Sequence, residues 1–238
     1  MCSLEKRGNV WVLSIAGDGQ NRLSPTLIDS LLSALTRLTT QATPGSVLLT
    51  TAHGKFFSNG FDLAWAQSAA SPSAALLRLE SMVASLKPVV AALIALPMPT
   101  IAAVNGHASA AGLLLALSHD YVLMRSDYGV LYMPEVNIGL PMPDYFAAVM
   151  RSKIRSAAAL RDLMLGGAKV RAAEAVKMGM VESAHDSAES TVEAAMRLGE
   201  RLAQRKWLGE VYAEIRKSLY PDACIVLGLT QKPIVSKI

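Results

Sequence analysis

The chain has 238 residues, of which 52% are hydrophobic and 18% are charged, so we expect one large domain with a sizeable core and some self-association. The net charge of +4 comes without a dense run of Lys and Arg, and we expect no nucleic-acid partner. Cys2 and Cys224 lack disulfide or metal spacing, and prolines interrupt the longest apolar segment, residues 83–104. We therefore expect no disulfide, no metal site and no membrane span.

The first elements predicted along the chain are a strand, a helix and a second strand. Residues 10–16 alternate loosely and indicate a strand. Ser24 and Pro25 are typical of a helix cap followed by the first helical position, and apolar residues then recur on one helical face to about residue 40. The β-branched and Leu-rich residues 46–51 indicate a buried strand. This order predicts a right-handed parallel crossover.

A polar, glycine-containing segment follows, with the sequence HGKFFSNGFDL at residues 53–63. Gly54, Gly60 and the Ser-Asn pair between them allow unusual backbone dihedral angles. Taken alone, the segment is also compatible with an ordinary polar loop before a helix. Residues 73–96 predict a long helix, which we expect to kink or break at Pro88.

The stretch from residue 100 to residue 140 combines a strand, a turn of very small residues and a helix. Residues 100–104 indicate a strand, residues 108–112 are small, and residues 113–117 are apolar and helical. A helix that begins in such a turn leaves backbone N–H groups uncovered and suited to an anion. Short β-type runs at 121–124 and 129–133 then lead to Glu135. A carboxylate in apolar surroundings beside an anion site suggests proton transfer next to a carbonyl.

The last third of the chain is predicted to be helical. The expected helices are residues 143–154, 156–164, 171–177, 188–205 and 209–219. We expect a core over residues 1–180 and a C-terminal helical region with a terminal tail over residues 181–238.

Two motifs resemble the crotonase (enoyl-CoA hydratase/isomerase) superfamily. One is VNGHASAAGLLLALSHDYVL at residues 104–123, and the other is the earlier GKFFSNGFDL at residues 54–63. The likeness extends over about residues 10–183. The resemblance implies an α/β fold, a spiral of β-β-α units followed by a C-terminal helical region. It also implies a fatty enoyl-CoA substrate, no cofactor beyond the coenzyme A carried by that substrate, and a homotrimer or hexamer.

The resemblance also implies the site residues. The oxyanion hole would be formed by the backbone N–H groups of Phe61 and Ala111, although the family often has alanine at the first position. Arg22 lies where the family binds the coenzyme's phosphates with a basic residue, and a solvated arginine is the equal alternative. The remaining substrate-binding residues implied in these motifs are Ser58, Asn59, Gly60, Asp62, Gly112 and Leu114.

The glutamate pattern implies the reaction. Hydratases of this family have two catalytic glutamates, and this chain has Leu114 at the first position and Glu135 at the second. This is the pattern of the monofunctional Δ3,Δ2-enoyl-CoA isomerases, in which one carboxylate moves a proton from C2 to C4 and a dry site suppresses water addition. From local sequence alone, a solvated Glu135 at a strand end has even odds or better, and the resemblance favours the catalytic role. The alternative functions are hydration or thioester hydrolysis by the same fold. A third alternative is a non-catalytic subunit that binds acyl-CoA.

Two polar residues near the motifs have structural interpretations. We expect Asp120 to cap the start of a strand, and His107 to be a structural histidine whose ring nitrogens have hydrogen-bond partners.

The last three residues, Ser236, Lys237 and Ile238, differ by one side chain from the Ser-Lys-Leu peroxisomal signal. Together with the resemblance, which is greatest to plant peroxisomal members, this tripeptide predicts binding to the peroxisomal import receptor and location in the peroxisome matrix.

Overall fold

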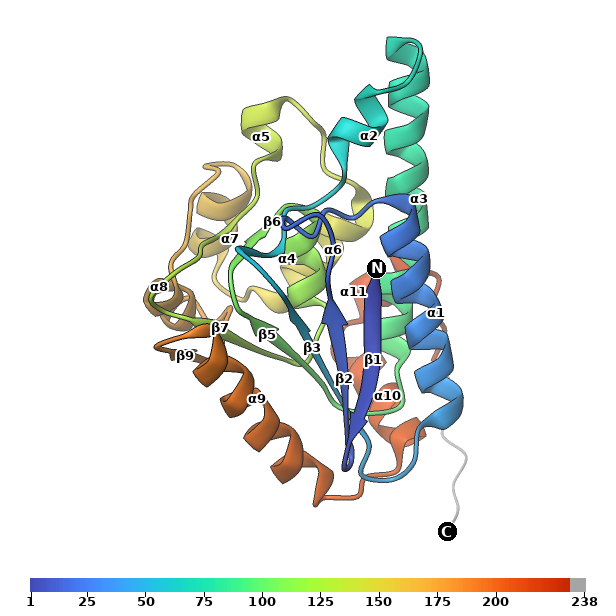
Figure 1. The fold of residues 1–238 in the computed structure, drawn as a ribbon, viewed down its shortest axis with the longest axis vertical. Coiled ribbons are helices and arrows are strands. Elements are labelled where there is room, and N and C mark those ends of the chain that lie inside the picture. The colour runs from blue at the N-terminus through green and yellow to red at the C-terminus, as the bar shows by residue number, and fades with distance from the viewer. Residues whose placement is uncertain (232–238) are drawn as a thin grey trace.

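The computed structural model describes residues 1–231, which form two sheets joined by helices (Figure 1). The larger sheet has six strands in the order β1-β2-β3-β5-β7-β9. They are β1 (Cys2–Arg7), β2 (Val10–Ile15), β3 (Val47–Ala52), β5 (Thr100–Val104), β7 (Tyr121–Arg125) and β9 (Ser183–His185). The smaller, parallel sheet consists of β4 (Phe56–Ser58), β6 (His107–Ser109) and β8 (Leu131–Tyr132).

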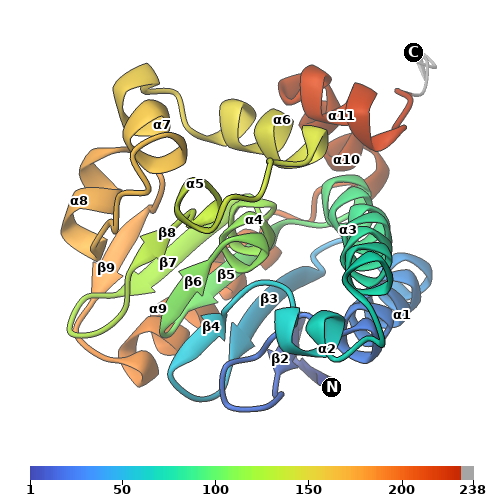
Figure 2. The same ribbon diagram turned by 90° about the horizontal axis from the view of Figure 1, so that it is seen from above.

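The helices follow the strands in a repeating order. They are α1 (Pro25–Gln41), α2 (Leu63–Gln67), α3 (Pro72–Ala95), α4 (Ala111–Leu117), α5 (Glu135–Ile138), α6 (Asp144–Lys153), α7 (Ala157–Met164), α8 (Ala172–Lys177), α9 (Ala188–Ala203), α10 (Gly209–Leu219) and α11 (Pro221–Leu227). A strand of the large sheet, a strand of the small sheet and a helix recur as β3-β4-α2, β5-β6-α4 and β7-β8-α5. Figure 2 shows β4, β6 and β8 in the same order as β3, β5 and β7. The predicted α/β spiral of β-β-α units is confirmed.

Local sequence explains where the main elements begin. The Ser24 hydroxyl accepts a hydrogen bond from the Leu27 N–H, and Pro25 is the first residue of α1, as predicted. Strand β2 pairs with β3 in parallel, which the strand–helix–strand order predicts. Pro88, in contrast, lies inside α3 and does not break it. Its neighbours Val89 and Val90 are fully buried, and packing of this kind offsets the loss of one helical hydrogen bond.

The two faces of the large sheet are covered differently (Figure 1). Helix α9 packs on one face, where Leu49, Ile101 and Leu123 meet Ala195 in a smaller core. Helices α1 and α3 and the small sheet lie on the other side, around the main core. The smaller core shows that residues after position 180 pack directly on the large sheet. The division at residue 180 stays a prediction.

An ion pair attaches the C-terminal helices to this core. The Arg216 guanidinium on α10 is 97% buried and lies 2.6 Å from the Asp120 carboxylate, at the start of β7. It also donates hydrogen bonds to four carbonyl oxygens at the end of α3 and just after it, those of Leu93, Ile94, Leu96 and Met98. Asp120 in turn accepts a hydrogen bond from the Thr100 N–H, as expected of a residue that caps a strand. Among residues 1–231, no helix is long and apolar enough to cross a membrane.

Candidate active site

Two backbone segments that are far apart in sequence meet at the N-terminus of α4. Strand β4 pairs with β6, so the turn after β4 lies beside the turn after β6. A Cβ added to Gly60 would lie 2.9 Å from the Ala110 Cβ and 3.5 Å from the Ala111 nitrogen. A Cβ added to Gly112 would overlap the Ser58 carbonyl. Glycine is needed at both positions because any side chain would separate the two segments.

The N–H groups of Phe61 and Ala111 are free at this meeting point. Neither donates a hydrogen bond to any atom of residues 1–231. Gly60 precedes the first with φ +76°, and Ala110 precedes the second with φ +52°, an unusual value for a residue with a side chain. These conformations direct two adjacent donors away from their own secondary structure, which is the arrangement that stabilises a developing oxyanion.

Glu135 supplies the carboxylate of the site. It is the first residue of α5, immediately after Pro134, and is only 8% exposed. Its Oε2 atom is buried without a hydrogen-bond partner among the described residues. Burial raises the pKa of the Glu135 carboxyl above its usual value, although the residue's own N–H opposes this in part. A carboxylate held in this way is a better base than a solvated one, and the alternative of a solvated Glu135 is wrong.

Two adjoining cavities meet at Glu135. One, of about 360 Å³, is largely apolar and lies between α3 and α6, with Val83, Tyr145 and Phe146 in its wall. The other, of about 340 Å³, is lined by Arg22, Asn59 and Tyr132 among others. Four residues line both cavities: Phe61, Leu79, Glu135 and Leu140. The pair of cavities therefore suits a ligand with an apolar end and a polar end, with its middle beside Glu135.

The predicted site residues fall into two groups. Arg22, Asn59, Phe61 and Glu135 line the cavities, whereas Ala111 lines neither, although the preceding residue, Ala110, lines the second. Arg22 is also paired with Asp18 at 2.9 Å, so its role toward a phosphate stays a prediction.

The other predicted residues support the site without lining it. The Ser58 hydroxyl donates to the Asn21 carbonyl, and the Asp62 carboxylate accepts a hydrogen bond from the Trp65 N–H at the start of α2. Gly60 and Gly112 provide the close backbone contacts, and Leu114 is fully buried in the main core. Their predicted contacts with substrate, and that of Leu114 above all, stay predictions.

Sequence reasoning missed most of the cavity walls. Leu79 and Val83 come from α3, Leu140 from the loop before α6, and Tyr145 and Phe146 from α6. The Tyr145 hydroxyl donates to the Val83 carbonyl at 2.8 Å, which ties α6 to α3 across the apolar cavity. The available signal was the apolar face of each helix, but such a face does not distinguish a cavity wall from a packed core.

The histidines near the site in sequence have structural roles. The His107 ring lies between the rings of Phe56 and Tyr128, and its Nδ1 accepts a hydrogen bond from the Val130 N–H. His119 is fully buried between the Leu115 carbonyl and the Thr50 hydroxyl. Within residues 1–231, no group of three or more His, Cys, Asp or Glu side chains is arranged to hold a metal ion.

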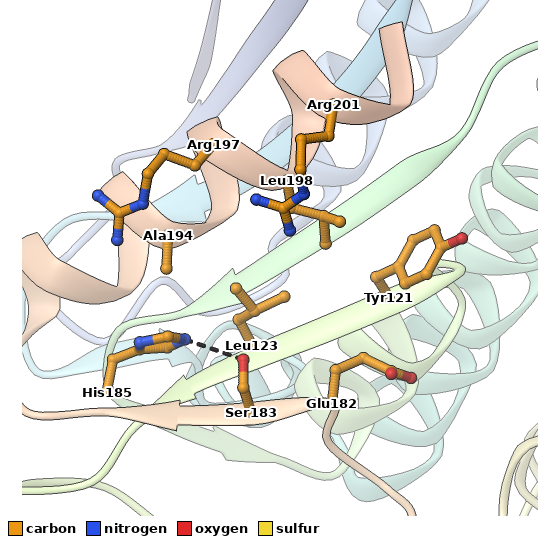
Figure 3. Close-up of a pocket in the computed structure, with 9 residues that line it drawn as sticks. All are labelled: Tyr121, Leu123, Glu182, Ser183, His185, Ala194, Arg197, Leu198 and Arg201. Carbon is orange, nitrogen blue, oxygen red and sulfur yellow. Dashed lines mark hydrogen bonds between the residues drawn. The ribbon is translucent and has the colours of Figure 1, made fainter. Parts of the chain in front are cut away.

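A further cavity of about 390 Å³ lies on the opposite face of the large sheet. Figure 3 shows Arg197 and Arg201 of α9 facing Ser183 and His185 of β9 across it. The Ser183 hydroxyl and the His185 Nε2 are 2.9 Å apart. This cavity contains none of the predicted site residues, so the two cavities at Glu135 are the candidate active site.

Comparison with known proteins agrees with this geometry. The family described as Enoyl-CoA hydratase/isomerase matches residues 5–221. The chain is 63% identical to "Enoyl-CoA delta isomerase 2, peroxisomal" of Arabidopsis thaliana, with 96% of each chain covered. It is 60% identical to "Enoyl-CoA delta isomerase 3" of the same plant, covering 97% of this chain and 96% of the relative.

Solved structures show the same fold. An enoyl-CoA isomerase of Mycobacterium tuberculosis superposes with a TM-score of 0.84 at 20% identity, over 95% of this chain and 94% of that one. A family match over residues 5–221, together with relatives that are 60–63% identical over nearly the whole chain, establishes that this chain belongs to the enoyl-CoA hydratase/isomerase family.

Proposed function

We propose that this protein is a Δ3,Δ2-enoyl-CoA isomerase, which converts 3-enoyl-CoA to trans-2-enoyl-CoA. The observation that carries the proposal is a single buried carboxylate, Glu135, at a junction of two cavities that is also lined by Phe61, one of two neighbouring residues whose backbone N–H groups are free. The relatives described above are named enoyl-CoA delta isomerases, at 60–63% identity over nearly the whole chain. This supports the same reaction here.

The reaction would proceed in two proton transfers. The Glu135 carboxylate removes a proton from C2, and the electrons move into the thioester to give an enolate. The N–H groups of Phe61 and Ala111 donate hydrogen bonds to the enolate oxygen. Glu135 then returns the proton to C4, and the double bond is left between C2 and C3. One carboxylate can perform both steps because it holds the proton it has removed.

The surroundings of the carboxylate favour isomerisation over hydration. Hydratases hold water between two glutamates, and this chain has the aliphatic Leu114 in place of the first. Met133 is fully buried two residues before Glu135. Without a glutamate at position 114, the site lacks the second carboxylate with which a hydratase holds water, and this disfavours addition of water to the product.

The proposed substrate would lie across both cavities. Its acyl chain would occupy the apolar cavity between α3 and α6, and the thioester and pantetheine would lie toward Asn59 and Arg22. The proton shuttle uses only the chain's own carboxylate and backbone, so we propose that no cofactor is needed beyond the coenzyme A of the substrate.

A direct assay tests the proposal. The protein is incubated with a 3-enoyl-CoA, and the conjugated 2-enoyl thioester is followed by its absorbance, while 3-hydroxyacyl-CoA and free coenzyme A are measured in the same samples. We expect the 2-enoyl product alone. The hydroxy product would indicate a hydratase and free coenzyme A a thioesterase. Binding of the substrate without any product would indicate a non-catalytic subunit.

We also propose that the protein self-associates through α10, as a homotrimer or hexamer. Val211, Ile215 and Leu219 are spaced four residues apart, on one face of this helix, and each is more than half exposed. Light scattering after gel filtration measures the assembly. Ile215→Glu should reduce its mass, and an unchanged mass would place the contact elsewhere.

The proposed location is the peroxisome matrix. Two relatives in Arabidopsis thaliana carry the word peroxisomal in their names. The predicted signal, Ser236, Lys237 and Ile238, lies outside the described residues, and its receptor contact is a proposal from the sequence. Deletion of these three residues should leave activity unchanged and move the protein to the cytosol. Continued import in cells without a full-length copy would refute the signal.

A further inference from the structure

The side chain of Phe61 lies in the wall of the candidate active site, and the proposed oxyanion role of its backbone N–H does not require a side chain there. Phe61 lines both cavities at Glu135, together with Leu79 and Leu140. It has the largest side chain of the three. The cavities therefore meet at a junction whose bulkiest wall residue is Phe61.

Aromatic side chains pack against one side of the Phe61 ring. Its centroid lies 6.2 Å from that of Phe146, which is only 1% exposed. Phe146 makes an edge contact with Tyr145 at 4.9 Å, and the Tyr145 hydroxyl is bonded to the Val83 carbonyl of α3. The Phe61 ring thus rests on a buried row of aromatic side chains held by two helices. The Phe61 ring is itself only partly buried, and these aromatic side chains support it on one side.

In the proposed function, the reacting carbons of the substrate lie beside the Phe61 ring. In the proposed function, the Phe61 N–H binds the thioester oxygen and Glu135 reaches C2 and C4, so C2 to C4 lie at the junction. The same residue would then fix the oxygen with its backbone and limit the width of the chain with its ring. Any substituent on C2 or C4 would compete with the ring for space.

We propose that the Phe61 side chain is a specificity-determining wall that selects acyl chains without a branch at C2 to C4. This inference rests on the proposed isomerase function and adds its substrate class: straight-chain 3-enoyl thioesters, with 4-methyl-3-enoyl thioesters rejected. The chemistry does not itself forbid the branched compound, because C2 still carries a proton and C4 can still accept one. Discrimination is therefore steric.

The test compares 3-hexenoyl-CoA with 4-methyl-3-hexenoyl-CoA in the wild type and in Phe61→Ala, which retains the backbone donor. We expect the wild type to prefer the straight chain, and the ratio of the two kcat/KM values to fall roughly tenfold or more in the variant, the usual effect of one methyl-sized group in a pocket. Leu76→Ala is the control, because Leu76 lines only the apolar cavity. It should change both substrates by a similar factor and leave the ratio as it was.

A binding measurement separates this inference from the proposed function. Calorimetric titration with hexanoyl-CoA and 4-methylhexanoyl-CoA, which do not react, gives the same discrimination without catalysis. If the wild type binds both equally, or if Phe61→Ala retains the wild-type ratio, the inference is wrong even when isomerase activity is present. If the wild type shows discrimination in binding but produces no 2-enoyl product, the isomerase function alone fails. Phe61→Leu replaces the alanine variant if the latter does not fold, and should give an intermediate ratio.

Discussion

Gly60 and Ala110 approach so closely that a Cβ on Gly60 would lie 2.9 Å from the Ala110 Cβ. The two residues are 50 positions apart in the sequence and each directly precedes a proposed oxyanion donor. The contact between them therefore sets the spacing of the Phe61 and Ala111 N–H groups.

Replacing Gly60 should damage catalysis through this spacing. We expect Gly60→Ala to push the two turns apart and lower kcat by roughly 10²-fold or more, the effect of losing one oxyanion donor. Gly19→Ala is the matched control, because Gly19 also has a positive φ, of +82°, but has no atom within 4 Å of an added Cβ. It should lose stability only. Equal losses of kcat in the two variants would mean that backbone strain, not separation of the donors, is responsible.

Removal of the base should stop the proton transfer. Glu135→Gln keeps the size of the side chain, and we expect kcat to fall roughly 10²–10⁴-fold, with little change in acyl-CoA affinity. Glu182→Gln, in the cavity on the opposite face of the sheet, is the control and should retain full activity. Turnover close to wild type in a folded Glu135→Gln protein would exclude this residue as the base.

The pH dependence of activity should report the same carboxyl. Burial raises the pKa of Glu135 above the ordinary value of 4.5, and the ionised form is the active one. Activity should therefore rise with pH through a midpoint above 4.5, as seen in a profile of kcat/KM for the free enzyme. A midpoint at or below 4.5 would contradict the desolvated position of the carboxylate.

His119 should make stability depend on pH in the acid range. Burial lowers the pKa of this histidine from 6.5 to about 4, so the unfolded chain takes up a proton at higher pH than the folded one. The free energy of unfolding contributed by neutral His119 is complete above pH 6.5 and is lost as the pH falls toward 4.

The loss is at most about 3.5 kcal/mol, at about 1.4 kcal/mol per pKa unit. Urea unfolding of wild type and His119→Gln at pH 7 and pH 4.5 measures it, since the variant has no group to titrate at this position. An equal loss in both proteins would show that other groups cause the pH dependence.

The buried ion pair should matter for stability more than any exposed pair. Arg216→Leu leaves the Asp120 carboxylate buried without its cation, and we expect the free energy of unfolding to fall by about 3–5 kcal/mol. Asp120→Asn combined with Arg216→Leu should lose less than the sum of the two single changes. Arg161→Leu is the control, because its pair with Asp162 is exposed and should contribute at most about 1 kcal/mol. Strict additivity would show that Asp120 and Arg216 do not act as a pair.

Much of the fold follows from local sequence, and the exceptions have physical causes. Helix α10 and strand β5 have the predicted bounds. Hydrophobic periodicity indicated the helix, and Pro99 and the Asn105-Gly106 turn delimit the strand. Strands β4 and β6 were not predicted as strands. Each has only three residues and exists through its pairing partner, which a local pattern does not identify.

The candidate site was predictable where it depends on backbone motifs. The small-residue turn indicated an anion site, and the apolar surroundings of Glu135 indicated a desolvated carboxylate. The choice of Phe61 and Ala111 as oxyanion donors came from the family resemblance and stays a prediction. The cavity walls on α3 and α6 were not predictable, because their apolar residues form the same pattern whether they face a ligand or the core. Leu114 was predicted to contact the substrate, but in the structure it is buried in the main core. Its contact with substrate therefore stays a prediction.

The pairing of Asp120 with Arg216 also has a consequence for how the chain folds during synthesis. Asp120 lies just after α4, the helix that begins with the Ala111 donor, and its only cationic hydrogen-bond partner among residues 1–231 is on α10, 96 residues later. In a nascent chain that ends before α10, the Asp120 carboxylate would lack the Arg216 guanidinium. The β-β-α core is therefore not expected to reach its final stability on the ribosome. It would do so only when nearly the whole polypeptide has emerged.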